Sequence, residues 1–529
     1  MTLARNVHEV LQDIVGEENI SEEPVILDTY CFQWLAETVT GNKFFTRPEA
    51  VVLPGNTDEV QAIVKACNRF GVKYKALSTG FGPWNAPGSE GVILLDLRRM
   101  NRILDIDEQN MYAVVEPYII FSQLQVEAMK RGLTCHIIGA GANTSPLASC
   151  TSMSGMGLSG ISMSYNARNP LAVEWVLPNG DLLRLGSLGS GCGWFCGDGP
   201  GPSLRGVMRG THGAMGGLGV FTKCAVKLYP WPGPRQMHFE GVSPGHAAAI
   251  PENFRSYVLC FPSWDSFADA AYKIAEAEIG YIMGKQIGAG IVPLMAARSP
   301  TEYANIRLSG MADEAMKEFR HSFQLILAAN SLGEIEYQDK ALQEILAETG
   351  GWVPAITQDL ERQKATFRMM VKVDGNSAVF RLSGSFGTSF GAETSCDAAM
   401  VHARLGEEIK QRYIERGVLA DDGAEWAWGA EMNEQGRFAH VEELFMYDPA
   451  DPESARAAAE FIEETSLLTA KQAPGLAIWE LARGGLGPKA HDIYGPACSN
   501  YHVWQRKIKR AFDPNTASDP SFYIEPEEC

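Results

Sequence analysis

The chain has 529 residues, 45% of them hydrophobic, and a formal net charge of −19 at pH 7. This length suits two or three domains, and the charge argues against nucleic-acid binding, which normally needs a basic face. No apolar run reaches the length of a membrane span, and the N-terminus lacks the apolar core of a signal peptide. A cytoplasmic location is therefore expected. The 11 cysteines are scattered without a Cys-x-x-Cys pair, which favours reduced thiols over a metal centre.

The first unit is predicted over about residues 45–135, after an N-terminal helix. Its hydrophobic spacing and its turn residues predict alternating strands and helices. In order, the elements are a helix at Val7–Val15, a strand at Val51–Leu53, a helix capped by Asn56 or Thr57 and ended by Gly71, strands at Val72–Leu77, Gly91–Leu97 and Tyr112–Glu116, and a helix at Ser122–Lys130.

A loop of small residues follows the strand Val72–Leu77. It reads Ser78-Thr79-Gly80-Phe81-Gly82-Pro83-Trp84. A strand, a crossover helix and another strand favour parallel pairing, and ligands bind at the carboxyl ends of such strands. Small side chains also let backbone N–H groups approach an anion. The sequence therefore indicates either a pyrophosphate-binding loop or an ordinary turn.

A second unit is predicted over about residues 136–235. The segment Gly139–Gly160 is rich in small residues, and its spaced methionines and leucines favour a buried loop over a flexible linker. Strands are predicted at Leu182–Leu185 and Val220–Leu228. Trp231–Pro234 is typical of a domain boundary.

Residues 236–475 alternate between helix-like and strand-like patterns, which predicts helices packed on one antiparallel sheet. Helices are predicted at Trp264–Glu278, Ala312–Ala329, Lys340–Glu348, Asp397–Arg416 and Pro452–Thr469, and strands at Ser256–Phe261, Thr366–Val373, Ala378–Phe386 and Val441–Tyr447. From residue 476 the chain is expected to return to the first unit, with a basic helix at Gln505–Phe512.

Several segments resemble, in order and spacing, the vanillyl-alcohol oxidase / p-cresol methylhydroxylase superfamily. They are Ser78–Gly80, Val92–Leu104, Ala113–Pro117, Val173–Gly180, Gly219–Thr222 and Ala511–Asn515. The resemblance implies an α+β fold, with a two-subdomain FAD-binding domain of the p-cresol methylhydroxylase (PCMH) type and a cap domain whose antiparallel sheet is covered by helices. The implied limits are 1–235 for the FAD-binding domain, 236–475 for the cap, and 476–529 for the returning segment.

The resemblance further implies that FAD is the cofactor. The residues expected to contact it are Ser78, Thr79, Gly80, Phe81, Gly82, Pro83, Trp84, Pro146, Ser149, Ser152, Gly157, Gly213, Gly216, Gly219, Val220 and Asn515. The loop at 78–84 contains no histidine, and the alignment places Glu443, not His440, at the position of covalent attachment in related oxidases. Non-covalent FAD is therefore expected.

Two residues are candidates for catalysis. Arg483 ends the segment Trp479–Arg483, which resembles the family's Trp-x-x-Tyr-Arg, and a guanidinium there would stabilise charge at flavin N1. His440 is a candidate base, or alternatively a structural histidine, and it lies three residues from Glu443, so the two would point to opposite faces of a strand. Ala482 and Pro83 or Trp84 stand where phenol-oxidising members have tyrosines, which counts against a 4-hydroxybenzylic substrate oxidised through a quinone methide.

These features imply an FAD-dependent oxidoreductase that removes a hydride from a C–OH or activated C–H of a small, possibly aromatic, substrate and passes electrons to oxygen or to an acceptor protein. One alternative is a D-2-hydroxyacid dehydrogenase of the lactate or glycolate kind. Another is a flavin-bearing subunit that needs a partner for catalysis. A homo-oligomer is expected.

Overall fold

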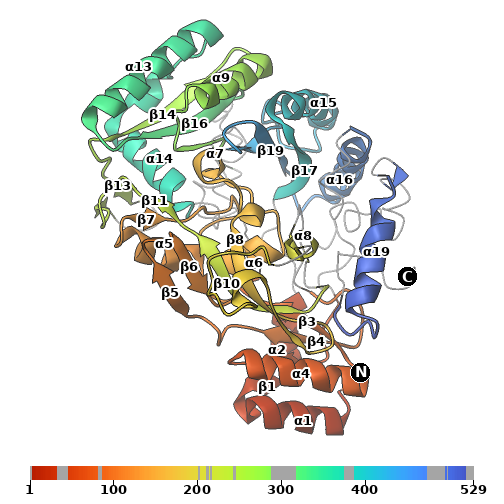
Figure 1. Ribbon diagram of the computed structural model, residues 1–529. Coiled ribbons are helices and arrows are strands. Elements are labelled where there is room, and N and C mark those ends of the chain that lie inside the picture. Colours follow the sequence, from red (N-terminus) through yellow and green to blue (C-terminus); the bar gives the residue numbers. More distant parts are fainter. Residues whose placement is uncertain are drawn as a thin grey trace.

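The computed structural model describes residues 3–31, 46–80, 86–199, 203–209, 214, 217–241, 246–286, 305, 317–374, 386–472, 495–496 and 499–519. Its N-terminal part holds two sheets with helices around them, and a larger sheet with its own helices lies above, forming the cap (Figure 1). This arrangement confirms the predicted α+β fold with a cap.

The first sheet has four strands and is built around two parallel pairs. The strands are β1 (Ile20–Ser21), β2 (Val51–Val52), β4 (Val92–Asp96) and β3 (Lys73–Leu77) in spatial order, and the helices are α1 (Arg5–Val15), α2 (Pro24–Cys31) and α4 (Thr57–Phe70). Both β2 and β3 run parallel to β4, which lies between them. The predicted caps of α4 are confirmed: Asn56 accepts a hydrogen bond from the N–H of Glu59, and Gly71 has a φ of +66°.

The second sheet has five antiparallel strands. In spatial order they are β5 (Ile103–Asp107), β6 (Tyr112–Val115), β10 (Val220–Lys227), β8 (Pro170–Val176) and β9 (Leu182–Arg184). The associated helices are α5 (Phe121–Met129), α6 (Pro146–Thr151), α7 (Gly160–Met163) and α8 (Arg205–Met208), and two short ladders pair β7 (Leu133–Thr134) with β11 (Tyr229–Pro230) and β12 (Phe239–Glu240) with β13 (Ala247–Ala248). The segment Gly139–Gly160 is thus folded and largely buried rather than a linker.

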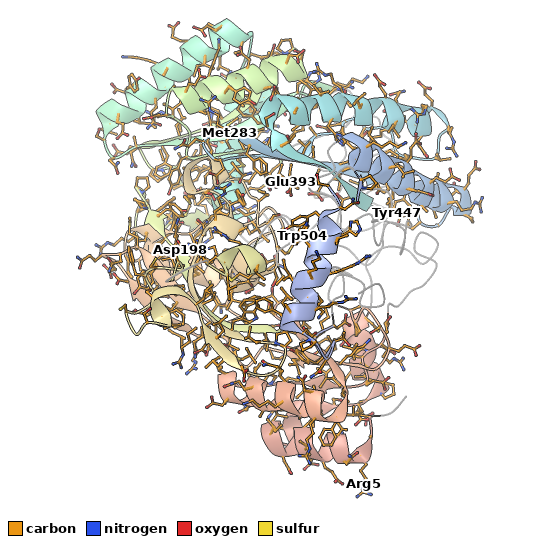
Figure 2. The ribbon with its side chains drawn as sticks, turned by 45° about the vertical axis from the view of Figure 1, so that its right-hand side comes forward. Arg5, Asp198, Met283, Glu393, Tyr447 and Trp504 are labelled. Carbon is orange, nitrogen blue, oxygen red and sulfur yellow. The ribbon has the colours of Figure 1, made fainter. Side chains whose placement is uncertain are left out.

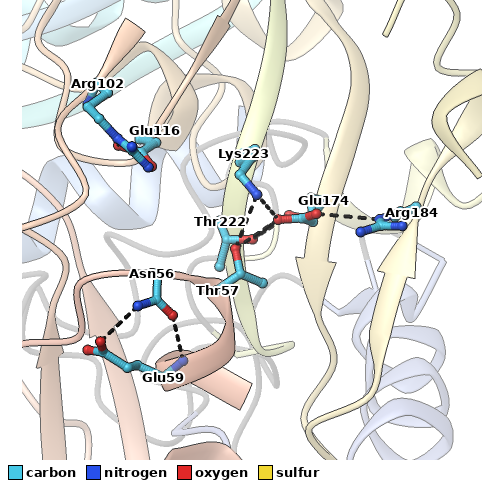
Figure 3. A network of polar contacts seen from close by, with 9 residues as sticks. All are labelled: Asn56, Thr57, Glu59, Arg102, Glu116, Glu174, Arg184, Thr222 and Lys223. Carbon is cyan, nitrogen blue, oxygen red and sulfur yellow. Dashed lines mark hydrogen bonds and ion pairs between the residues drawn. The ribbon is translucent and has the colours of Figure 1, made fainter. Parts of the chain in front are cut away.

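A buried carboxylate joins the two sheets (Figure 3). Glu174 on β8 accepts hydrogen bonds from Thr57 at the start of α4 (2.8 Å), from Thr222 (3.1 Å) and from the ammonium of Lys223 (2.6 Å). Burial opposes ionisation of Glu174, but the bonds from Lys223 and Thr57 outweigh it and lower the pKa. This network fixes the first turn of α4 against the second sheet.

Residues near the C-terminus pack into the N-terminal part. The helix α19 (Tyr501–Phe512) carries Lys509, whose buried ammonium donates to the carbonyl oxygens of Gly217 (2.6 Å) and Ser518 (2.7 Å) and to Asp513 (2.6 Å). Residue 518 forms a parallel bridge with Tyr74 of β3. The chain therefore returns to the first sheet after it has formed the cap.

The cap is built on a six-stranded sheet in which every pairing is antiparallel. Its strands are β14 (Phe254–Cys260), β16 (Ser322–Ala328), β15 (Ile282–Gly284), β18 (Trp428–Asn433), β19 (Phe438–Met446) and β17 (Phe386–Ser395) in spatial order, with helices α9 (Trp264–Glu276), α13 (Leu332–Thr349), α14 (Leu360–Lys372), α15 (Cys396–Glu415) and α16 (Pro452–Gln472).

The two faces of the cap sheet pack on different cores. Leu325 of β16 and Val441 of β19 belong to one core, together with α9, α13, α15 and α16. Ile326, the next residue along β16, belongs instead to the core of the second sheet, together with Phe367 of α14. Because side chains alternate along a strand, the face bearing Ile326 is turned toward the N-terminal part.

Two predicted elements of the cap are wrong. The helix predicted at Ala312–Ala329 is contradicted by the strand β16, because a fully buried strand and a buried helix both appear as an apolar run. The strand predicted at Thr366–Val373 lies in helix α14, which Asp359 caps by accepting from the N–H of Arg362. The predicted strand Ala378–Phe386 lies outside the described residues except for Phe386.

Candidate active site

Three side chains form a row across the cap sheet, on the face turned toward the N-terminal part. His440 on β19 lies directly opposite Glu431 on β18 and, on its other side, opposite Glu393 on β17. Glu442, two residues further along β19, shares the same face. All but Glu442 are fully buried, and Figure 2 labels Glu393 where the cap sheet approaches the N-terminal part.

The imidazole of His440 lies between two carboxylates. Its Nδ1 is 3.1 Å from Oε1 of Glu393, and its Nε2 is 3.7 Å from Oε2 of Glu442. Burial alone would lower the pKa of His440, but the hydrogen bond to Glu393 and the contact with Glu442 outweigh it and raise that pKa well above its usual value. The protonated, imidazolium form of His440 is therefore favoured.

Glu431 has the opposite character. The pKa of its carboxyl group is raised to about 8: burial is the main cause, the charge of His440 opposes it, and the neighbouring Glu442 and Glu393 add to it. At neutral pH Glu431 is mostly a neutral acid, and it becomes a carboxylate slightly above. A group whose pKa lies this close to the working pH can exchange a proton with a bound substrate.

The row meets the glycine-rich segment of the N-terminal part. A methyl group at Gly139 would overlap the carboxylate of Glu431, and one at Gly160 would overlap the amide oxygen of Asn433. Gly157 packs so closely on the backbone of Ile137 that it too has no room for a side chain. Glycine at these positions therefore lets the segment lie directly against the row.

A second group of charges lies on the other face of the same strand. Lys410 of α15 is completely buried, and its ammonium is 2.6 Å from Glu443 and 2.5 Å from Asp422, while Lys285 is 2.5 Å from Glu425. Glu443 and His440 therefore point to opposite faces of β19, as expected from their spacing. Glu443 faces Lys410 and does not belong to the row.

Most of the residues predicted to contact the cofactor are described by the structure, and they lie after β3, in and after α6, at the start of β10 and beside α4. Ser78, Thr79 and Gly80 follow the carboxyl end of β3, and Gly80 has a φ of +70°. Pro146 and Ser149 lie in α6, Ser152 follows it, and Gly157 is buried beside Gly139. Gly219 and Val220 begin β10, where the N–H of Gly219 donates to Ser518 (3.1 Å), and the amide of Asn515 donates to Asn68 of α4 (2.9 Å).

The other predicted contacts lie outside the described residues. They are Phe81, Gly82, Pro83, Trp84, Gly213 and Gly216, together with the catalytic candidate Arg483. Their roles stay predictions, as do those of the described contacts.

The sequence analysis missed Glu393, Glu431 and Glu442. A signal for Glu431 was present: in Ala430-Glu-Met-Asn433, polar and buried apolar residues alternate, as in a strand with one polar face. That Glu393 faces His440 depends on strand register between distant segments, which one sequence does not contain.

The N-terminal part is chemically suited to FAD. A dinucleotide carries negative phosphates, and residues 132–173 contain no Asp or Glu that would repel them. The loop that begins at Ser78 follows a strand that runs parallel to β4, the place where such sheets bind ligands. Positive φ at Gly80 and Gly155 provides the tight turns such loops need.

Comparison with known proteins agrees with these observations. A family model described as an FAD-binding domain matches residues 48–186. The chain is 27% identical over 232 residues to glycolate oxidase subunit GlcD of Bacillus subtilis, covering 44% of this chain and 46% of that protein. It is 31% identical over 193 residues to the flavoprotein subunit of 4-cresol dehydrogenase [hydroxylating] of Pseudomonas putida, covering 35% of this chain and 36% of that protein.

The same fold is found in a crystal structure of p-cresol methylhydroxylase with substrate bound. The two structures share 18% sequence identity with a TM-score of 0.74, and the match covers 99% of this chain and 97% of the other. The sequence matches, in contrast, span less than half the length of the curated relatives.

Fold and sequence together define a flavoprotein with an FAD-binding domain and a cap. Residues 48–186 match an FAD-binding domain, and the chain as a whole has the fold of p-cresol methylhydroxylase. Among the described residues, no helix is long and apolar enough to cross a membrane.

Proposed function

We propose that this protein is an FAD-dependent oxidoreductase in which Glu431 accepts the proton of a small substrate oxidised at a C–OH or activated C–H. Bound FAD would take up the hydride, and the protein must supply the base and orient the substrate. The observation that carries the proposal is the position of Glu431, beside His440 and against Gly139 of the glycine-rich segment. The 4-cresol dehydrogenase relative is a flavoprotein subunit, and the other relative is a subunit of glycolate oxidase, which supports the same class of reaction.

Glu431 is a better base than His440 for a physical reason. A base must be unprotonated when the substrate binds, and His440 is held as an imidazolium by Glu393 and Glu442. The pKa of Glu431, about 8, leaves a useful fraction of carboxylate at neutral pH. His440 then acts as a positioning residue, whose positive charge favours the carboxylate form of Glu431.

The charge of the row favours a neutral substrate. His440 and its three neighbours Glu393, Glu431 and Glu442 place three carboxyl groups and one imidazole together, an excess of acidic groups. A 2-hydroxyacid would bring a further negative charge into this buried environment, which costs energy unless a cation compensates it. We therefore favour neutral alcohols, and Arg483 would have to compensate the charge of a hydroxyacid.

The names of two relatives support the two alternative functions. The glycolate oxidase relative favours a D-2-hydroxyacid dehydrogenase, and the name of the 4-cresol dehydrogenase flavoprotein subunit favours a protein partner for electron transfer. Oxygen and an acceptor protein are both compatible with the described residues, and so is a homo-oligomer. We expect FAD to be bound non-covalently.

Anaerobic reduction of the purified holoprotein tests the proposal. Benzylic and aliphatic alcohols, alkylphenols and D-2-hydroxyacids are added separately, and bleaching of the visible flavin band is followed. We expect bleaching by neutral alcohols. Bleaching by hydroxyacids alone would favour the dehydrogenase, and bleaching only after addition of a partner would favour the subunit. Acid precipitation, with the yellow colour remaining in the supernatant, would support non-covalent FAD.

A further inference from the structure

One region of this acidic protein has the opposite charge balance. Residues 132–239 contain three acidic residues, Glu174, Asp181 and Asp198. The same residues include seven basic ones: Arg168, Arg184, Arg205, Arg209, Lys223, Lys227 and Arg235. The whole chain has 64 acidic and 45 basic residues, so the excess of positive charge here is local and would attract anions.

Four of these cations gather around one short turn, Ala167–Pro170. Arg205 donates to the carbonyl oxygen of Pro170 (2.7 Å), and Arg209 donates to that of Ala167 (3.5 Å). The backbone N–H of Lys227 donates to the carbonyl oxygen of Asn169 (3.1 Å), and Arg168 belongs to the turn itself. Segments that are 30 to 60 residues apart in the sequence are thus brought together on one surface.

The cations of this group are close enough to repel one another. Burial lowers the pKa of Arg209, and the charges of Arg205 and Arg168 lower it further. Burial likewise lowers the pKa of Lys227, with added contributions from Arg205 and Arg209. A group of like charges held together in this way gains stability when an anion binds.

The neighbouring carboxylates neutralise only half of this charge. Arg205 pairs with Asp198 (3.0 Å) and Arg168 approaches Glu434 (3.5 Å), which leaves a net charge of +2 on four cations. Within the described ranges, Lys227 and Arg209 form no ion pair, and the buried Nε of Arg205 has no hydrogen-bond partner. Residues 199–239 contain no Asp or Glu, so this stretch supplies no further carboxylate to neutralise the cations.

We propose that Arg205, Arg209 and Lys227 bind a phosphate group, either as free phosphate or as a phosphate ester. A phosphate dianion matches the net charge of +2, and guanidinium groups present paired N–H donors to its oxygens. The Nε of Arg205 would gain an acceptor. A carboxylate would neutralise only half as much charge.

The proposed site lies apart from the predicted pyrophosphate loop and from Gly219 and Val220, but close to α6, because the N–H of Ala167 donates to the carbonyl oxygen of Ser154 (3.0 Å), two residues beyond the predicted contact Ser152. Lys227 ends β10, whereas Gly219 and Val220 lie at its beginning, and an eight-residue strand spans roughly 23 Å. The predicted pyrophosphate loop at Ser78–Gly80 follows a strand of the other sheet. Asp198, which pairs with Arg205, is labelled in Figure 2 well apart from Glu393.

Calorimetric titration of the holoprotein with inorganic phosphate tests the proposal, at an ionic strength kept constant with sodium chloride. We expect saturable binding that Arg209→Gln and Lys227→Gln each weaken at least tenfold. Arg209→Lys should weaken it less, because the charge remains. Lys340→Gln, at an exposed position of α13, is the matched control and should bind phosphate normally. Glycerol 3-phosphate, titrated in parallel, distinguishes an ester from free phosphate by which binds more tightly.

Three results would overturn the proposal. They are an equal response to phosphate and to added chloride, unchanged phosphate affinity in both glutamine variants, and loss of FAD from those variants. The last would assign the cations to the cofactor site. FAD content and the circular dichroism spectrum are recorded for every variant, so that a folding defect is recognised. If one of the two glutamine variants is misfolded, the phosphate affinity of the other tests the proposal.

Discussion

Glu431 on β18 and His440 on β19 are directly opposed in the antiparallel register of the cap sheet, with both side chains buried on the face turned toward the FAD-binding domain. The pKa of Glu431 is raised to about 8, mainly by burial, and the charge of His440 opposes this rise. The pair thus combines a cation that keeps its proton with an acid that can release one near neutral pH.

Replacement of Glu431 by glutamine should remove the base and keep the shape. The base is active as the carboxylate, so in the wild-type protein the rate of flavin reduction should rise with pH through about 8. In Glu431→Gln we expect a rate lower by roughly 100- to 10,000-fold, with this pH dependence gone. Stopped-flow reduction measures both, and Glu336→Gln, exposed on α13, is the control. A rise near pH 8 that persists in the variant would exclude Glu431 as the base.

Replacement of His440 by asparagine should shift the pH at which the rate of flavin reduction rises. The imidazolium favours the carboxylate form of Glu431, so its loss raises the pKa of Glu431 and shifts the rise in rate to higher pH. The rate at neutral pH falls, and it recovers in part at alkaline pH. A purely structural histidine would lower the rate equally at every pH, which the same pH series would reveal.

Gly160→Ala should destabilise the contact between cap and FAD-binding domain. The added methyl group would overlap the amide oxygen of Asn433, and overpacking of this kind costs about 1–3 kcal/mol. Gly333→Ala, in α13 with open space around it, should be neutral or stabilising and serves as the control.

The double variant Gly160→Ala/Asn433→Ala tests whether that overlap is the cause. Asn433→Ala removes the atom in question, so the cost of the two changes together should be smaller than the sum of their separate costs. Strictly additive values in urea unfolding would show that the methyl group is accommodated elsewhere.

Lys410→Met should strongly destabilise the cap. Removal of the ammonium leaves Glu443 and Asp422 buried without their cation, and loss of one partner from a buried ion pair costs about 3–5 kcal/mol. Lys340→Met, which removes an exposed lysine, should have little effect. Equal urea midpoints for the two variants would contradict this account of the network.

Asp513→Asn should weaken FAD binding without touching the predicted contacts. The carboxylate of Asp513 accepts from Lys509 and from the N–H groups of residues 517 and 518, and Ser518 in turn accepts from the N–H of Gly219. Loss of this charge loosens the start of β10, so we expect at least a tenfold rise in the dissociation constant of FAD, measured by fluorescence titration of the apoprotein. Asp397→Asn, at the exposed start of α15, is the control.

Local signals in the sequence predicted much of the N-terminal part. The N-cap Asn56 and the glycine at the end of α4 depend on near neighbours in the chain. The strands on either side of α4 are parallel as predicted, but they do not pair with each other, because β4 lies between them. The elements of the cap were harder to predict, because a buried strand such as Ser322–Ala328 has the same apolar run as a buried helix. Within the candidate site, His440 was identified from the sequence, whereas its partners depend on pairing between β17, β18 and β19.

The return of residues 513–519 to the first sheet sets the order of events during synthesis. The N–H of Gly88 donates to the carboxylate of Asp519, 431 positions later in the chain, and Tyr74 pairs with residues 517 to 519. A ribosome releases these partners only after the whole cap has emerged, so the FAD-binding domain completes its hydrogen bonds after translation has passed the cap. Cofactor loading on a stalled nascent chain should therefore be poor until residue 519 is free, and the cap can fold before the domain beneath it is complete.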